Sequence, residues 1–247
     1  MVHDGLVVDL VFQEKGVCGV SEQIFCLGHR QRLRERFLKG GEDALAAYEI
    51  IEMFLFSVNP RKDMKPLAKR LLAKFGSVTN VLNADEAELL SVEGMGRTAL
   101  ATLKLIQVTG QRQHREIAMN QRVTEISTWR HVLNYCEVSM AHLKREQLRL
   151  FFLDKQYKLI GEEIQMLGTV DHAPVYVREI VNKAVNVGAT GLVLVHNHPS
   201  GDPTPSGSDI EATRQIKDTA ERMGITLYDH IIIGKGKHTS LKHQGLI

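Results

Sequence analysis

The chain has 247 residues, a formal net charge of +2 and a hydrophobic content of 43%. These values are typical of a soluble globular protein with one large domain or, as we expect here, two domains of ordinary size. The longest apolar runs, such as Ile50–Val58, are too short to span a bilayer, and Met1–Val20 lacks the continuous apolar core of a secretory signal. We therefore expect a cytoplasmic protein with no membrane partner.

The three cysteines do not form a disulfide framework and suit a reducing compartment. Cys18 and Cys26 have a poor spacing for zinc, and no second pair follows that could complete such a site. The mildly basic net charge permits contact with nucleic acid but does not require it.

A helical domain is predicted for residues 29–114, after an extension over residues 1–28 that matches no periodic pattern. The sequence leaves open whether the extension is flexible. The helical domain begins with a strongly basic run. Apolar residues at helical spacing then predict helices over 44–56, 67–75 and 84–90, with Asn83 as the N-cap of the last one.

Two glycines, Gly94 and Gly96, separate the last of these helices from a long helix that reaches about His114. A short helix, a Gly-x-Gly hinge and a second helix are typical of a helix-hairpin-helix, in which exposed amides and a helix N-terminus can bind a phosphate. Arg97 follows the hinge, and three further basic residues could add positive charge nearby: Lys104, Arg112 and Arg115. Contact with DNA would be independent of base sequence. The alternative is a glycine turn that only packs two helices together.

A polar stretch, residues 115–124, is predicted to link this domain to a second one over residues 125–247. Strands and helices are intermixed in the second domain, which predicts an α/β fold with a central sheet flanked by helices. The predicted strands are 147–153, 157–170, 192–195 and 226–233, and the predicted helices are 127–138, 175–187 and 209–223.

Two histidines, His196 and His198, follow an apolar strand, and Asp209 then opens a helix. Because successive strand residues point to opposite faces, the two imidazoles emerge on the same side, with Cα atoms about 6.6 Å apart. Two imidazoles and a carboxylate, with a fourth position left for water, are what a catalytic zinc site needs. Asp202 is an alternative third ligand, although its Pro- and Gly-rich surroundings favour a turn.

The pattern His196-x-His198, Ser206 and Asp209 resembles the signature of the JAMM (MPN-type) metalloproteases residue for residue. The surrounding segments, together with the Gly94-Met95-Gly96 hairpin, resemble the RadC family in particular, over roughly residues 29–247. The segments that carry this resemblance are Glu162-Glu163-Ile164, Gly168-Thr169-Val170, Val177–Val181, His196–Asp202 and Asp229–Gly234. The resemblance implies a cytidine-deaminase-like α/β fold. It also implies zinc bound by His196, His198 and Asp209, with water as the fourth ligand.

The resemblance further implies an upstream glutamate as general acid and base. Adjacent residues of a strand face opposite ways, so only one of Glu162 and Glu163 can face the metal, and the position of the motif favours Glu163. Glu179, which begins a predicted helix, is a weaker candidate. Ser206 would stabilise the oxyanion, or else it, or Ser208, simply caps the following helix.

Two classes of function follow. The first is a zinc hydrolase, most simply a metallopeptidase or isopeptidase acting on a protein or peptide that the sequence does not identify. The second is a DNA-binding accessory factor in repair or recombination, and the two can coexist. A zinc-dependent nuclease is a less favoured variant, because no basic phosphate clamp accompanies the motif. A metal-stabilised scaffold without catalysis would fit if the glutamate faced away from the ion.

Overall fold

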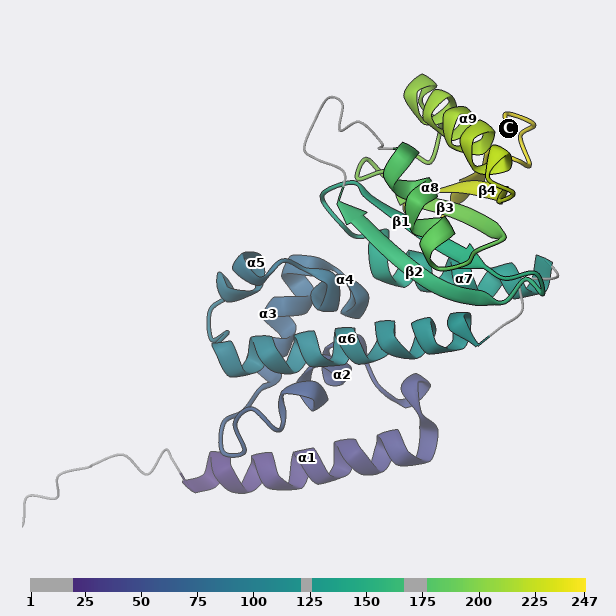
Figure 1. The fold of residues 1–247 in the computed structure, drawn as a ribbon. Coiled ribbons are helices and arrows are strands. Elements are labelled where there is room, and N and C mark those ends of the chain that lie inside the picture. Colours follow the sequence, from purple (N-terminus) through teal and green to yellow (C-terminus); the bar gives the residue numbers. More distant parts are fainter. Residues whose placement is uncertain (1–19, 121–125, 167–176) are drawn as a thin grey trace, which may run out of the picture. The chain divides into compact units, whose positions relative to one another are not determined.

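The computed structural model describes residues 20–120, 126–166 and 177–247 (Figure 1). The chain divides into two compact units, residues 1–106 and 107–247, and the boundary falls within helix α6 (Arg97–Met119). None of the helices in the described residues combines the length and the apolarity needed to cross a membrane.

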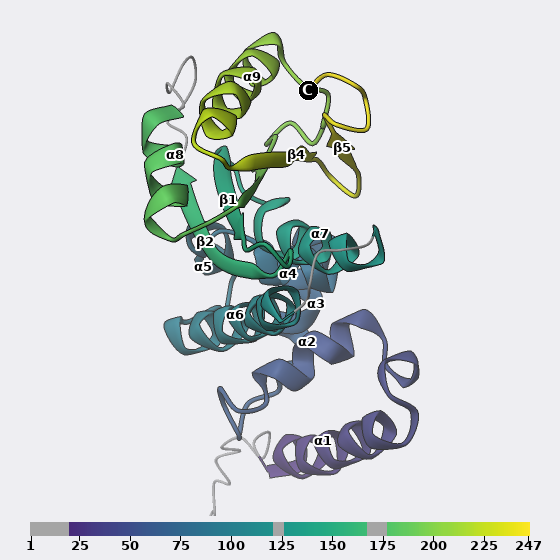
Figure 2. The same cartoon turned by 45° about the vertical axis from the view of Figure 1, so that its right-hand side comes forward.

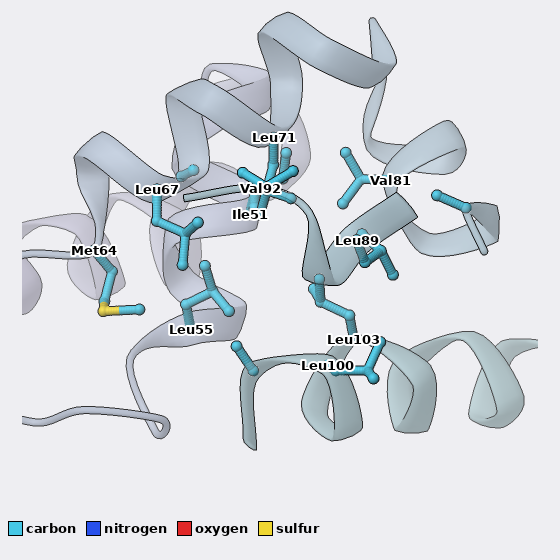
Figure 3. Packing of buried hydrophobic residues seen from close by; sticks show 13 residues of the cluster. Ile51, Leu55, Met64, Leu67, Leu71, Val81, Leu89, Val92, Leu100 and Leu103 are labelled. Carbon is cyan, nitrogen blue, oxygen red and sulfur yellow. The ribbon is translucent and has the colours of Figure 1, made fainter. Parts of the chain in front are cut away.

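The first unit consists of helices. They are α1 (Val20–Gly40), the 3-10 helix η1 (Glu42–Ala44), α2 (Ala47–Leu55), α3 (Lys65–Phe75), α4 (Val78–Asn83), α5 (Glu86–Leu90) and the beginning of α6. Figure 3 shows the apolar faces of α2 to α6 meeting in one core, which includes Ile51, Leu71, Leu89 and Leu103. The helical fold predicted for this part of the chain is confirmed.

Two predicted boundaries differ from the structure. Helix α1 begins at Val20, so the last part of the predicted extension is helical, while residues 1–19 lie outside the described residues. Helix α6 continues to Met119 through the first part of the predicted linker, because Ala118 is fully buried in the core of the second unit. Residues 121–125 lie outside the described residues.

The predicted N-cap at Asn83 is wrong, because Asn83 is the last residue of α4, a helix that the sequence analysis missed. Ala84 and Asp85 are extended, and α5 begins after Asp85, whose backbone N–H donates to the Glu88 carboxylate. The Ser77 hydroxyl caps α4 by accepting from the Asn80 N–H. Two short helices with their own caps therefore replace the single predicted one.

The second unit is a sheet with helices on both faces, as predicted. Its described strands are β1 (Gln147–Leu153), β2 (Leu159–Met166), β3 (Gly191–Asn197), β4 (Thr226–Ile233) and β5 (His238–Ser240), and its helices are α7 (Ile126–Met140), α8 (Val177–Asn186) and α9 (Gly207–Arg222). The described strands lie in the order β2-β1-β3-β4-β5. Strands β3 and β4 are parallel, and the other neighbouring pairs are antiparallel. Of the strand predicted over 157–170, β2 covers 159–166, residues 167–170 lie outside the described residues, and β5 was not predicted.

The two faces of this sheet carry different helices, as Figure 2 also shows. Helix α7 packs on one face, against Phe151 and Val193. Helices α8 and α9 pack on the other face, against Leu150 and Leu194. We call these the α7 face and the α8/α9 face. Because alternate residues of a strand share a face, His196 lies on the α8/α9 face with Leu194.

A β-bulge in β4 alters the alternation of its side chains. Leu192 pairs with Leu227, but the next residue, Val193, pairs with Asp229, so Tyr228 is the extra residue. The bulge places His230 on the α8/α9 face together with Leu227, whereas strict alternation would have placed it on the opposite one. His230 therefore lies on the same face as His196.

Candidate metal centre

Three side chains from the end of β3 and the start of α9 meet at one point. His196 is within β3, His198 follows the strand directly, and Asp209 lies in the first turn of α9. Each offers one ligand atom, and these atoms all lie within 4.8 Å of one another. The Nε2 atoms of His196 and His198 are 2.9 Å apart, and each lies 3.5 Å from a carboxylate oxygen of Asp209.

These distances fit a tetrahedral zinc ion. Zinc ligand bonds of about 2.0–2.1 Å at the tetrahedral angle place the ligand atoms roughly 3.3 Å from one another. The observed Nε2–Nε2 separation is 2.9 Å, and each Nε2 lies 3.5 Å from a different oxygen of Asp209, Oδ1 for His196 and Oδ2 for His198. The donor set of two imidazoles and a carboxylate is also one that zinc prefers. The residues that the sequence motif singled out can thus hold a zinc ion together.

The loop after β3 orients His198. Its Nδ1 lies 2.8 Å from the backbone carbonyl oxygen of Asp202, which can only accept, so Nδ1 carries the proton. Nε2 faces the ligand atoms of His196 and Asp209. The carboxylate of Asp202 points elsewhere: it is exposed and accepts hydrogen bonds from the backbone and side chain of Thr204. Asp202 therefore shapes the loop and is not part of the donor cluster.

Ser206 is the N-cap of α9, one of the two roles that the sequence left open for it. Its Oγ accepts from the Asp209 N–H, and its own N–H and hydroxyl both donate to Oδ2 of Asp209, at 2.8 and 2.6 Å. This reciprocal capping box fixes the carboxylate of Asp209 at the helix N-terminus. Ser208 is not the cap, and its hydroxyl lies 2.8 Å from that of Ser206.

Burial and contacts within the cluster shift the pKa values of His196, His198 and Asp209 in different directions. Burial lowers the pKa of His196 to about 4, so this imidazole is neutral at physiological pH. The hydrogen bond with Asp209 raises the pKa of His198, although burial opposes it. Burial acts to raise the pKa of Asp209, but hydrogen bonds from His198 and Ser206 hold it well below its usual range. Asp209 is therefore a carboxylate at neutral pH.

These pKa values predict how zinc affinity depends on pH. Zinc binds only unprotonated imidazole. Because the pKa of His198 is raised from 6.5, a proton already competes with the metal at pH 6.5 and slightly above, and competes more strongly as the pH falls. His196 takes up a proton only near pH 4. We expect the zinc affinity to fall about tenfold per pH unit between roughly pH 6 and pH 4, and more steeply below. Chelator competition across this range checks the slope, and a slope of two decades per unit near pH 5.5 would mean that both histidines titrate together.

The adjacent glutamates of β2 lie on opposite faces of the sheet. Glu163 pairs with Leu150 and therefore lies on the α8/α9 face, as His196 does. It is not part of the three-residue donor cluster, and its carboxylate contacts Lys183 of α8 in a half-exposed ion pair. Glu162 lies on the α7 face, where only 3% of its side chain is exposed.

Glu162 is enclosed by donors. Its carboxylate accepts from Arg149 at 3.0 Å, from Arg115 at 2.8 Å and from the Tyr135 hydroxyl at 2.9 Å. Glu162 is thus held on the α7 face of the sheet by structural contacts. Glu179, the third glutamate considered from sequence, is exposed in the first turn of α8.

In the first unit, the hairpin between α5 and α6 is exposed at Gly94, Gly96 and Arg97. Gly94 has φ +86°, a left-handed conformation that favours glycine, and Arg70 of α3 donates to the carbonyl of Glu93 beside it. The predicted hinge is therefore a tight exposed turn. Whether it binds DNA stays a prediction.

The basic residues expected to support this hairpin are engaged elsewhere. Lys104 donates to the carbonyls of Leu82 and Ala84 at the end of α4, which makes it a structural cap. Arg112 pairs with Glu116, and Arg115 with Glu162. These contacts engage one group of each side chain, and whether the three residues add positive charge at the hairpin stays a prediction.

Sequence reasoning gave no role to two residues near the donor cluster. Thr213 lies four residues after Asp209, on the same side of α9, and that helical spacing is the only signal for it. Lys183, the partner of Glu163, belongs to no motif. His230 of β4 is buried between His196 and Thr213.

Comparison with known proteins finds a family model for each of two parts of the chain. A family model described as "RadC-like JAB domain" matches residues 126–246, and one described as "UPF0758 N-terminal" matches residues 24–101. A UPF0758 protein from Rhodobacter capsulatus is 48% identical over 215 residues, which cover 87% of this chain and the whole of that protein.

Proposed function

The chain belongs to the RadC family, and from that premise we propose that it is a zinc-dependent hydrolase that cleaves an amide or isopeptide bond in a protein or peptide. The observation that carries the proposal is the convergence of His196, His198 and Asp209, a donor set that zinc prefers, with one ligand atom of each within 4.8 Å of the others. Glu163, a carboxylate on the same face of the sheet, supports it.

When bound, zinc supplies Lewis acidity, which polarises a carbonyl and lowers the pKa of water to about 7. Glu163 takes the proton of the attacking water and returns it to the leaving amine. The hydroxyl of Ser206 stabilises the developing oxyanion, for which it must turn from Asp209 toward the substrate. The backbone N–H of Ser206 still holds Asp209 during that rotation.

The contact between Glu163 and Lys183 is compatible with this role. Both side chains are more than a third exposed, at 39% and 38%, so water screens the pair and replaces it at a cost of about 1 kcal/mol or less. Glu163 is therefore free to turn toward a substrate bound at the donor cluster.

A Glu163→Gln variant tests the proposal. We expect it to retain one zinc per chain and to cleave about 10²–10⁴-fold more slowly, because the amide cannot accept the proton. A library of peptides and isopeptide-linked peptides, read by mass spectrometry, first identifies a cleaved bond in the wild type. Glu179→Gln, which removes an exposed carboxylate from α8, is the matched control and should keep full turnover. Unchanged turnover in Glu163→Gln would remove Glu163 from the reaction.

A second role, as a DNA-binding accessory factor in repair or recombination, is favoured by the exposed hairpin at Gly94, Gly96 and Arg97. We expect affinity for duplex DNA to fall steeply with salt and to be independent of base sequence. Arg97→Glu should weaken it further, whereas Arg214→Glu, a charge change on α9, should leave it unchanged. Fluorescence anisotropy at two salt concentrations measures the DNA affinity of the wild type and of both variants. An affinity that does not change with salt would contradict the DNA-binding role.

A further inference from the structure

A chain of short hydrogen bonds lies behind His196, on the side away from the donor cluster. His196 Nδ1 is 2.7 Å from His230 Nε2, and His230 Nδ1 is 2.6 Å from the hydroxyl of Thr213. That hydroxyl is 2.5 Å from the backbone carbonyl oxygen of Asp209. The chain begins at one residue of the donor cluster and ends at another.

Two local features of the fold assemble this chain. The bulge at Tyr228 turns His230 onto the α8/α9 face, where it meets His196 of the neighbouring parallel strand. One turn of α9 places Thr213 above Asp209. His196, His230 and Thr213 are all buried, so water does not compete for these hydrogen bonds.

The carbonyl of Asp209, at the end of this series of hydrogen bonds, determines which atom donates in each of them. A carbonyl oxygen only accepts, so the Thr213 hydroxyl donates to Asp209 and has only lone pairs left for His230. His230 Nδ1 must then carry a proton and donate to Thr213. The other nitrogen of a neutral imidazole only accepts, so His230 Nε2 accepts from Nδ1–H of His196.

We propose that His230 and Thr213 are positioning residues, which keep the proton of His196 on Nδ1 and leave its Nε2 free as a metal ligand. The proposal rests on the proposed function for the metal itself. It assigns to the bulge in β4 the task of orienting a ligand of the neighbouring strand. The hydrogen bonds also couple the ring of His196 to the backbone of Asp209, so that one series of hydrogen bonds holds both ligands.

Replacing Thr213 by valine should reverse the direction of the hydrogen bond between His230 and His196. Valine has nearly the same shape, but it leaves Nδ1–H of His230 without an acceptor in a buried site. The proton of His230 then moves to Nε2, which donates to His196 Nδ1, and His196 carries its own proton on Nε2. That tautomer cannot bind zinc through Nε2. Thr213→Ser retains the hydroxyl and is the matched control.

The first measurement uses the ¹⁵N shifts of the histidine rings in the metal-free wild-type chain, which show which nitrogen carries the proton. We expect protons on Nδ1 of both His196 and His230, and in Thr213→Val a shift of both toward Nε2. A proton on Nε2 of His196 in the wild type would overturn the proposal. This readout requires neither zinc nor a substrate.

The second measurement is the zinc dissociation constant by chelator competition. We expect Thr213→Val to bind zinc about 10–100-fold more weakly, the usual effect of losing a partner behind a ligand, and Thr213→Ser to bind as the wild type does. Thr213→Val with unchanged affinity and unchanged tautomers would overturn the proposal, because a residue with a packing role alone gives that result. A wild-type chain that binds no zinc would refute the proposed function, and its ring shifts would still support or overturn the proton chain.

If Thr213→Val does not fold, two substitutions at His230 replace it. The amide oxygen of His230→Gln can accept from Nδ1–H of His196, so this variant should keep most of the zinc affinity. His230→Leu removes the acceptor and should weaken zinc binding by the same 10–100-fold. Equal affinities for the two variants would contradict the proposal.

Discussion

Asp209→Asn should lose stoichiometric zinc while it keeps its fold. The wild type is expected to retain about one zinc per chain after dialysis, and the variant to bind it more than about 100-fold more weakly, since even the loss of a partner behind a ligand costs 10–100-fold. The amide oxygen can still accept the hydrogen bonds from Ser206, so the cap of α9 is preserved. The loss of affinity then reflects the missing carboxylate charge.

The matched control is Asp202→Asn. Asp202 is the other aspartate of the loop, and its exposed carboxylate contacts Thr204 and lies outside the donor cluster. It should retain zinc as the wild type does. Elemental analysis of the dialysed proteins and chelator competition measure the two variants. Retention by Asp209→Asn together with loss by Asp202→Asn would show that the wrong carboxylate has been assigned.

Arg149→Met should strongly destabilise the second unit. The guanidinium of Arg149 is 5% exposed, binds Glu162 at 3.0 Å and lies 4.9 Å from the ring centre of Tyr135. Burial raises the pKa of Tyr135 to about 12, so its neutral hydroxyl remains a donor to Glu162 but brings no positive charge. Arg115 still contacts Glu162 after this change but is itself half exposed. The carboxylate therefore loses its buried cation, and the cost approaches that of a broken buried ion pair, about 3–5 kcal/mol.

For a unit of this size, such a loss lowers the melting temperature by roughly 10 °C. A second substitution, Glu162→Gln, made together with Arg149→Met should restore much of the stability, since it removes the buried carboxylate that has lost its buried partner. Lys183→Met breaks the half-exposed pair with Glu163 on the other face and should cost less than about 1 kcal/mol. Calorimetry or urea unfolding measures all three, and equal losses for Arg149→Met and Lys183→Met would contradict this assignment.

Much of the fold follows from local patterns in the sequence. Strands β1 and β4 have the predicted bounds, because an apolar run ended by polar or glycine residues marks them clearly. The bounds of α6 did not follow, since Ala118 becomes buried only through contacts with residues far along the chain. Helix α4 was missed for a different reason, because its N-cap Ser77 resembles an ordinary polar loop residue.

The candidate site shows the same limit. The spacing of His196, His198 and Asp209 along the chain indicated a metal site, and the alternation of β2 predicted that its two glutamates face opposite ways. The contacts of Glu162 with Arg115 and Arg149 join residues that are far apart in sequence, and no pattern announces them. The orientation of His230 depends on a bulge, which a strict two-residue period cannot anticipate.

The three metal donors lie within one short strand-loop-helix segment, whereas Glu163 belongs to β2, which has a single strand neighbour among the described strands. Outer strands of a sheet fray at lower free energy than inner ones, because fewer backbone hydrogen bonds hold them. On the proposed assignment of roles, fraying of β2 alone would leave an ion-loaded but inert protein. Zinc content and catalytic activity would then be separable, and each would have to be measured on its own.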